Sequence, residues 1–323
     1  METRMIRKFL AATWLLTFGV IALAQDWPAR PIKYIVPFPP GGATDIISRP
    51  LADELRERLG QPVVIENIGG AGASIGSARL KQAPPDGYTI GLGNSASHTI
   101  TPHLLAKLPY DPLSDFTPIT LLTDYANVLV VSAQSPVKDM KQFLALARNK
   151  PEGLSYGSAG NGSSNHLSSA LLAQMTDLKF IHVPYKGSNA ALSDLLGGQV
   201  DWMFATISEI RPFLQSGRLR ALGISTKTRD ALLPDVAPIA ETVPGFEVLG
   251  FMGLFAPAKL SPAIAARLNS EVVTILQSPD MVERFAALGM RPRTSTQDEF
   301  AARVKRDHAL WKSVVNAAGL KSE

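Results

Sequence analysis

Two segments of the chain each join a short apolar strand to a helix through a glycine-rich turn. In the first, the apolar run 34–36 leads into Pro-Pro-Gly-Gly at 39–42, and in the second, residues 155–158 lead into Ala-Gly-Asn-Gly at 159–162. A helix N-terminus presents unpaired N–H groups and the positive end of the helix dipole, so it attracts anions without any basic side chain. Two such termini that face each other would bind an anionic small molecule.

Apolar periodicity supports a helix after each turn. Apolar side chains recur every four positions, at Ile47, Leu51, Leu55 and Leu59 and again at Leu167, Leu171 and Met175. Short runs rich in β-branched or aromatic residues alternate with helical patterns elsewhere, at 63–65, 88–92, 128–131 and 200–204. This alternation predicts an α/β protein built on largely parallel sheets.

The first 24 residues have the layout of a secretory signal peptide. Arg4, Arg7 and Lys8 precede an uncharged, mostly apolar stretch over 9–24, which ends in the small-x-small sequence Ala-Leu-Ala. We therefore expect export, cleavage after Ala24 and a periplasmic location. The remaining length suffices for two domains, and the chain has no cysteine, so disulfides and thiolate metal sites are excluded. A net charge of +4 gives no argument for nucleic-acid binding.

Enzyme-like patterns are weak. Residues 72–76 match the G-x-S-x-G nucleophile elbow, with Ser74 as the serine, but the preceding strand ends several residues earlier than an elbow requires. We favour small residues that allow tight helix packing, and we keep a secreted α/β hydrolase that uses Ser74 as the alternative. The five histidines do not form a metal-binding pattern, and no dinucleotide fingerprint or Walker sequence is complete. We expect no cofactor and no metal.

Ordered motifs run along the whole mature chain. They lie at 37–45 with Arg49, at 64–67, 86–88, 108–111, 115–116, 156–160, 166–167, 183–187 and 233–236. Each is short, but together and in this order they are specific. The chain resembles, over nearly all of its mature length, the periplasmic solute receptors of tripartite tricarboxylate transporters, known as the Bug family.

The resemblance implies a two-lobed periplasmic binding protein of type II, a Venus flytrap, with a mainly parallel sheet in each lobe. Lobe 1 would comprise residues 25–125 and 248–323, and lobe 2 residues 126–247, with the ligand in the cleft. It implies a monomeric, non-enzymatic receptor for a small carboxylate that serves an inner-membrane permease or a sensor kinase. A receptor for an ATP-driven importer is a further alternative, because fold alone does not identify the membrane partner.

The resemblance and the two glycine turns together place the ligand between residues 38–45 and 158–166. The resemblance implies that backbone N–H groups and hydroxyls hold the carboxylate, and the absence of Lys and Arg from both turns fits this. The candidate ligand-binding residues are Phe38, Gly41, Gly42, Ala43, Thr44, Asp45, Asn94, Ser95, Ser158, Gly160, Gly162, Ser163, His166 and Thr206. Simpler roles stay open: turn geometry for the glycines, helix capping for Ser163 and Thr206, and loop orientation for His166.

Overall fold

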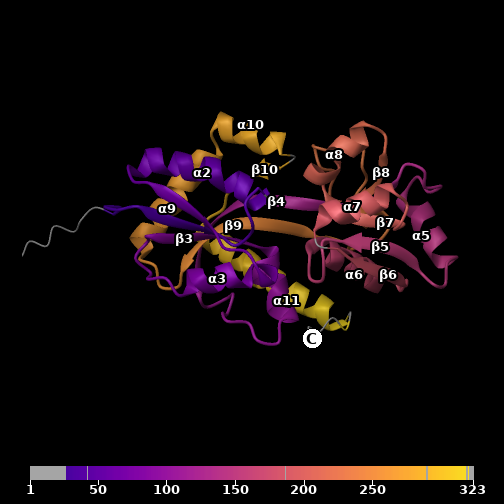
Figure 1. Cartoon of the computed structure of the whole chain (residues 1–323), viewed down its shortest axis with the longest axis horizontal. Coiled ribbons are helices and arrows are strands. Elements are labelled where there is room, and N and C mark those ends of the chain that lie inside the picture. Colours follow the sequence, from indigo (N-terminus) through magenta and orange to yellow (C-terminus); the bar gives the residue numbers. More distant parts are fainter. Residues whose placement is uncertain (1–26, 42, 186, 289, 318, 320–323) are drawn as a thin grey trace, which may run out of the picture.

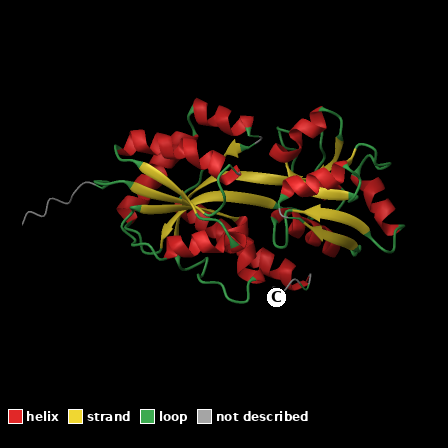
Figure 2. Ribbon diagram, viewed as in Figure 1, coloured by secondary structure: helices red, strands yellow, loops and turns green. Residues whose placement is uncertain are grey.

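The computed structural model describes residues 27–41, 43–185, 187–288, 290–317 and 319. The predicted signal peptide and Gly42 lie outside the described residues. The chain forms one long, twisted sheet with helices on both of its faces (Figures 1 and 2). The expected α/β organisation is confirmed.

Within the described residues, ten strands make up the sheet. They are β1 (Ile32–Val36), β2 (Val63–Asn67), β3 (Thr89–Asn94), β4 (Phe116–Ser132), β5 (Leu154–Ser158), β6 (Phe180–Pro184), β7 (Trp202–Thr206), β8 (Leu219–Ile224), β9 (Leu249–Pro257) and β10 (Arg291–Pro292). Every strand expected from the apolar runs is present, with ends shifted by a few residues, except that β4 begins twelve residues before the expected run 128–131.

The helices that follow the strands cover the sheet. They are α2 (Ala43–Leu59), α3 (Ser74–Lys81), α4 (Thr101–Leu104), α5 (Met140–Arg148), α6 (Ser164–Thr176), α7 (Ser188–Leu196), α8 (Ile207–Gln215), α9 (Pro262–Leu276), α10 (Pro279–Ala287) and α11 (Gln297–Ala317). Short helical turns occupy Ala71–Ala73, Ala96–Ile100 and Ile239–Glu241. Helix α2 continues through Pro50, although proline cannot donate a backbone hydrogen bond there.

The sheet has a parallel three-strand unit at each end. β1 pairs in parallel with β2 and β3, and β5 pairs in parallel with β6 and β7. The long strand β4 joins the two units, and its neighbours β9, β7, β8 and β10 all run antiparallel to it. Figure 1 shows β4 and β9 running through the middle of the molecule, with β1–β3 at one end and β5–β8 at the other. We call these ends the first and second halves of the sheet.

Strand β4 changes partner near its middle. Its residues up to Ala126 pair with β9, and from Asn127 onward it pairs with β7. Ser225, just after β8, holds this crossing together: its Oγ accepts from Asn127 N at 2.9 Å and donates to Val248 O at 2.5 Å. The chain therefore passes between the two halves at two adjacent points.

Each half buries apolar side chains on both faces of its sheet. In the first half, α2 and α9 pack on one face, while α3 and α11 contribute to a second cluster around Phe255 and Phe300. In the second half, the core on one face surrounds Trp202, and α7 and α8 pack on the other face. Burial of each large apolar side chain contributes roughly 1.5–3 kcal/mol. Stable cores on either side of the crossing hold the loops at the strand ends in place.

Candidate functional site

The carboxyl ends of β1, β3, β5 and β7 all lead toward the crossing. Asn94, the last residue of β3, pairs with Met252 of β9, which in turn pairs with Thr123 of β4. Thr206, the last residue of β7, pairs with Asn127 of β4. Thr123 and Asn127 are four residues apart, a distance of about 13 Å along a strand. Loops that follow the carboxyl ends of strands are where open α/β sheets usually bind ligands.

The first glycine turn is built around Asp45. This carboxylate is buried and accepts from Gly41 N at 2.9 Å, from Arg49 Nε and Nη2 at 2.9 Å each, and from Asn67 Nδ2 at 2.9 Å. Asn67 Nδ2 also donates to Phe38 O at 3.1 Å. Burial alone would raise the pKa of Asp45, but these hydrogen bonds and the Arg49 charge outweigh it and hold the pKa below its usual value.

Asp45 therefore has a structural role in the turn, because Gly41, Arg49 and Asn67 share its two carboxylate oxygens. Direct contact of Asp45 with a ligand stays a prediction, as do the contacts expected from Phe38, Gly41, Ala43 and Thr44. The amides of the first turn of α2, at residues 43–46, have no carbonyl four residues earlier within the helix. These backbone groups remain the natural donors to a bound anion on this side.

The second glycine turn is closed by its own polar groups. Gly160 N donates to Ser158 Oγ at 3.1 Å, and Gly162 N donates to His166 Nδ1 at 3.0 Å. Ser163 Oγ donates to Gly160 O at 2.6 Å and accepts from His166 N at 3.4 Å, so Ser163 is the N-cap of α6. Gly160 and Gly162 have φ values of 119° and 77°, which favour glycine.

The hydroxyls expected to contact the ligand are thus committed to the turn itself. Ser158 is fully buried, and both the capping role of Ser163 and the loop-orienting role of His166 are confirmed. The amides in the first turn of α6, at Ser164 and Asn165, lack an intrahelical partner by geometry. Relative to the second glycine turn, these amides occupy the same position as the N-terminal amides of α2 occupy relative to the first glycine turn.

His182, which was not among the candidate residues, is the neighbour of this turn. It lies on β6, opposite Tyr156 of β5, and its Nε2 is 2.6 Å from Ser158 Oγ. Its ring stacks on His166 with centroids 3.9 Å apart and 5° between the planes. Burial lowers the pKa of both rings, to about 3 for His166.

The remaining candidates lie on the same side of the strands but are also internally bonded. Thr206 caps α8: its N donates to Glu209 Oε2 at 2.8 Å, which confirms the capping interpretation. Ser95 Oγ accepts from Phe251 N at 2.8 Å, and Asn94 Oδ1 accepts from Ser97 N at 3.0 Å. Ligand contact by Thr206, Asn94 and Ser95 stays a prediction.

Tyr125 is a central residue that the sequence gave no reason to single out. It lies on β4 just before the crossing, and its ring packs so tightly on Gly250 that a Cβ there would overlap it. Burial raises the pKa of its hydroxyl, while hydrogen bonds with Ser95 and Ser164 act in the opposite direction. Tyr125 therefore joins the loop after β3 to the first turn of α6.

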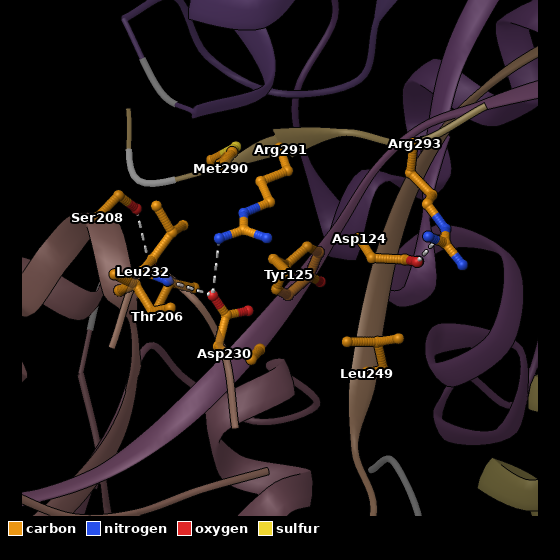
Figure 3. Close-up of a pocket in the computed structure, with 12 residues that line it drawn as sticks. Asp124, Tyr125, Thr206, Ser208, Asp230, Leu232, Leu249, Met290, Arg291 and Arg293 are labelled. Carbon is orange, nitrogen blue, oxygen red and sulfur yellow. Dashed lines mark hydrogen bonds and ion pairs between the residues drawn. The ribbon is translucent and has the colours of Figure 1, made fainter. Parts of the chain in front are cut away.

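A cavity of about 190 Å³ lies beside Thr206, between the start of α8 and β10 (Figure 3). Side chains from both halves line it, among them Ser208 and Asp230 on one side and Arg291 and Arg293 on the other. Each arginine has an acidic partner: Arg291 is 3.9 Å from Asp230, and Arg293 is 3.6 Å from Asp124. Because these charges compensate one another, the cavity offers no uncompensated arginine to an anion.

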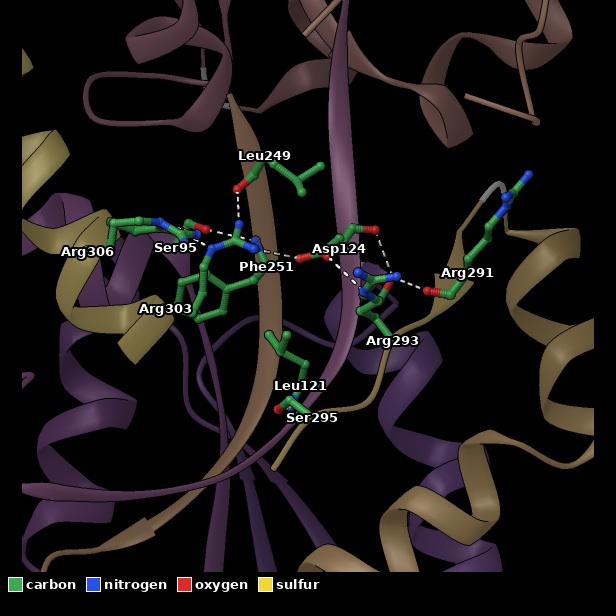
Figure 4. Close-up of polar contacts among 12 residues, drawn as sticks. Ser95, Leu121, Asp124, Leu249, Phe251, Arg291, Arg293, Ser295, Arg303 and Arg306 are labelled. Carbon is green, nitrogen blue, oxygen red and sulfur yellow. Dashed lines mark hydrogen bonds and ion pairs between the residues drawn. The ribbon is translucent and has the colours of Figure 1, made fainter. Parts of the chain in front are cut away.

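Arg303 of α11 fixes the crossing strands from the other side (Figure 4). Its guanidinium donates to Asp124 Oδ1 of β4 at 3.2 Å and also to Leu249 O of β9 and Asp307. Burial raises the pKa of Asp124 despite Arg303 and Arg293 beside it. One largely buried side chain therefore links both connections between the halves to α11.

Ser74 is not arranged as a catalytic nucleophile. It is the buried first residue of α3, seven positions after the end of β2, and among the described residues no hydrogen bond joins it to a histidine. Within the same part of the chain, no group of three or more acidic or histidine side chains is placed to hold a metal ion. None of the described helices combines the length and apolar character that crossing a membrane requires.

Comparisons with known proteins agree with this geometry. Residues 47–320 match the model of the tripartite tricarboxylate transporter family receptor. Protein BugT of Bordetella pertussis is 35% identical over 312 residues, which cover 95% of this chain and 96% of BugT. The family is a receptor family rather than an enzyme class, and it gives no support to the hydrolase alternative.

Solved structures of similar proteins share the fold. R. palustris Rpa4515 with adipate is 33% identical, with a TM-score of 0.81, and covers 91% of this chain and 99% of its own. MatC (Rpa3494) from Rhodopseudomonas palustris with bound malate is 35% identical, with a TM-score of 0.78, and the match covers 90% of this chain and 100% of MatC. Periplasmic binding protein BugD is 31% identical, with a TM-score of 0.78 over 92% and 100%. The periplasmic-binding-protein fold is confirmed, and the chain belongs to the tripartite tricarboxylate transporter receptor family.

Proposed function

We propose that this protein is an extracytoplasmic receptor that captures a small organic carboxylate between two lobes and catalyses no reaction. The observation that carries the proposal is the pair of helix N-termini, α2 and α6, each preceded by a glycine turn that internal hydrogen bonds hold in shape. Both present first-turn amides without a basic side chain, which suits a carboxylate. The adipate and malate bound to relatives support the same class of ligand.

The change of partner along β4 supports a division into two lobes. Along β4, pairing passes from β9 to β7 between Ala126 and Asn127. The chain returns to the first half at Val248–Leu249, where Ser225 Oγ donates a hydrogen bond to Val248 O. This supports lobe 1 at 25–125 and 248–323 and lobe 2 at 126–247. A ligand that contacts both lobes would favour the closed arrangement by its extra contacts there.

The exported receptor would act in the periplasm after cleavage behind Ala24. It would work as a monomer, without cofactor or nucleic acid, and present the bound acid to inner-membrane permease subunits or a sensor kinase. The signal-peptide layout of residues 1–24 and the family's role as transporter receptors support this assignment. Neighbouring genes for transporter subunits would separate a permease partner from an ATP-driven importer.

A thermal-shift screen of residues 25–323 tests the proposal. The panel contains malate, adipate, other mono-, di- and tricarboxylates, and neutral and cationic solutes of similar size. A true ligand at about 100 times its Kd should add about 2.7 kcal/mol to the free energy of unfolding. An increase in melting temperature with neutral or cationic solutes only would contradict the proposed carboxylate site.

The Ser74→Ala variant is the control for the hydrolase alternative. The receptor should keep its ligand affinity in this variant, and NMR should show the bound acid unchanged after long incubation. Chemical conversion of the acid by the wild-type protein, lost in Ser74→Ala, would refute the non-enzymatic assignment.

A further inference from the structure

The second glycine turn rests on two stacked imidazoles that each bond to it at a different point. His166, on α6, accepts from Gly162 N at 3.0 Å, and His182, on β6, has its Nε2 2.6 Å from Ser158 Oγ. The two rings are parallel within 5° at a centroid distance of 3.9 Å. Tyr156 lies beside both rings, with its ring centroid 4.9 Å from that of His182 and 6.4 Å from that of His166.

The hydrogen bonds fix the proton position on one of the two rings. His166 Nδ1 accepts an amide proton, so in the neutral ring the proton is on Nε2. Ser158 Oγ accepts from Gly160 N at 3.1 Å and can donate its own proton either to His182 Nε2 or to Gly160 O at 3.3 Å, so His182 either accepts from Ser158 or donates to it. Both imidazoles bond to the turn, and burial lowers the pKa of both rings, which keeps them uncharged at neutral pH.

In this arrangement, the backbone amides of the turn donate hydrogen bonds to side chains that hold the turn. The N–H groups of Gly160 and Gly162 are satisfied by Ser158 and His166, and the left-handed φ values of the two glycines follow from that closure. A turn held in one conformation before the ligand arrives loses less conformational entropy on binding. The first-turn amides of α6 then need no rearrangement to reach an anion.

We propose that His166 and His182 are positioning residues: as a stacked neutral pair, each hydrogen-bonded to the turn, they hold the turn 158–163 in its binding conformation and so set the ligand affinity. The inference rests on the proposed carboxylate-receptor function. The two ring nitrogens are occupied by bonds to Ser158 and Gly162, so their effect on the ligand would pass through those residues.

Paired substitutions at His166 and His182 separate the hydrogen-bonding role of each side chain from the space that it fills. Asn at position 166 can place Oδ1 near the site of Nδ1, and Gln at position 182 can place Oε1 near the site of Nε2, whereas Leu fills space without an acceptor. We expect His166→Leu and His182→Leu to bind the acid at least about 10-fold more weakly, because a buried amide or hydroxyl loses its partner. His166→Asn and His182→Gln should restore affinity to within about 3-fold of the wild type.

Hydrogen exchange of the Gly160 and Gly162 amides supplies a readout without ligand. Protection should fall in the Leu variants and persist in the Asn and Gln variants. Ser158→Ala, which also removes the acceptor of Gly160 N, should weaken binding at least as much as His182→Leu. The double variant should be no worse than Ser158→Ala, because both substitutions remove the link between Ser158 and His182.

The inference is overturned if the Leu variants bind as tightly as the wild type, or if Leu and the acceptor-bearing variants lose affinity equally. A wild-type protein that binds no carboxylate would instead overturn the proposed function. In that case, unchanged protection of the Gly162 amide in His166→Leu would still overturn the positioning role.

Discussion

Mild acid should destabilise this protein well above the pH at which carboxylates titrate, because His98 is buried in an aromatic cluster. The ring is fully buried and stacks on Phe255 at 4.0 Å, with Phe116 at 4.8 Å. Its Nδ1 lies 2.8 Å from Ser97 Oγ, and among the described residues its Nε2 has no partner. Burial lowers the pKa of His98 to about 3.

The sign follows from proton uptake. Between about pH 6.5, the pKa of an unfolded histidine, and pH 3, the unfolded chain binds a proton that the native His98 does not. The contribution of neutral His98 to the free energy of unfolding is therefore fully present above about pH 6.5 and is lost progressively as the pH decreases. About pH 5 is roughly 1.5 units below the pKa of an unfolded histidine, so at this pH His98 lowers the free energy of unfolding by about 2 kcal/mol. His166, with a pKa of about 3, adds a loss of similar size.

Denaturant unfolding at about pH 8, 6.5 and 5 measures this effect. We expect the unfolding free energy to fall by about 4 kcal/mol between the two lower values. His98→Phe, which keeps an aromatic ring in the cluster, should remove about half of that fall. Asp124, whose pKa is raised by burial, acts in the opposite direction. A fall of less than about 1 kcal/mol, or an unchanged fall in His98→Phe, would refute the reasoning.

Three further substitutions test individual contacts. Asp45→Ala should cost about 2–3 kcal/mol and weaken ligand binding, because the Gly41 amide and two other donors lose a buried charged acceptor; denaturant unfolding and titration calorimetry measure both. Gly253→Ala would push a Cβ into the Phe300 ring, so we expect a loss of about 1–3 kcal/mol and a lower Tm, and an unchanged Tm would contradict that packing. Arg303→Met should cost about 1.5–3 kcal/mol, because Asp124, Asp307 and the Leu249 carbonyl lose a charged hydrogen-bond donor while Arg293 and Arg306 stay beside the aspartates; an unchanged free energy of unfolding would show that the Arg303 contacts are dispensable.

Much of the local structure was readable from the chain. Helices α2 and α6 begin directly after the glycine turns, and Gly160 and Gly162 adopt the positive φ values that the turns suggested. The cap at Thr206 was also readable, since Glu209 stands at the position that completes a capping box. These features depend on residues within a few positions of one another.

The chemistry within the turns was less readable. Ser158 and Ser163 looked like hydroxyl donors to a ligand, but in the structure they bond to the turn and to His182. Nothing local marks His182 as the partner of Ser158, because they are 24 residues apart and meet only through the parallel register of β5 and β6. Tyr125 was missed for the same reason: its neighbours Ser95 and Ser164 come from distant segments.

The sequence by itself determined the α/β pattern, the two glycine turns and the family, because helical periodicity, left-handed φ preference and capping are energies of neighbouring residues. Only the tertiary structure decided which polar groups those turns use internally and which backbone amides remain for an anion. That allocation depends on the register of β5 against β6 and on the crossing of β4 between β9 and β7. Register is selected by the burial of whole sheet faces, which no short segment encodes alone.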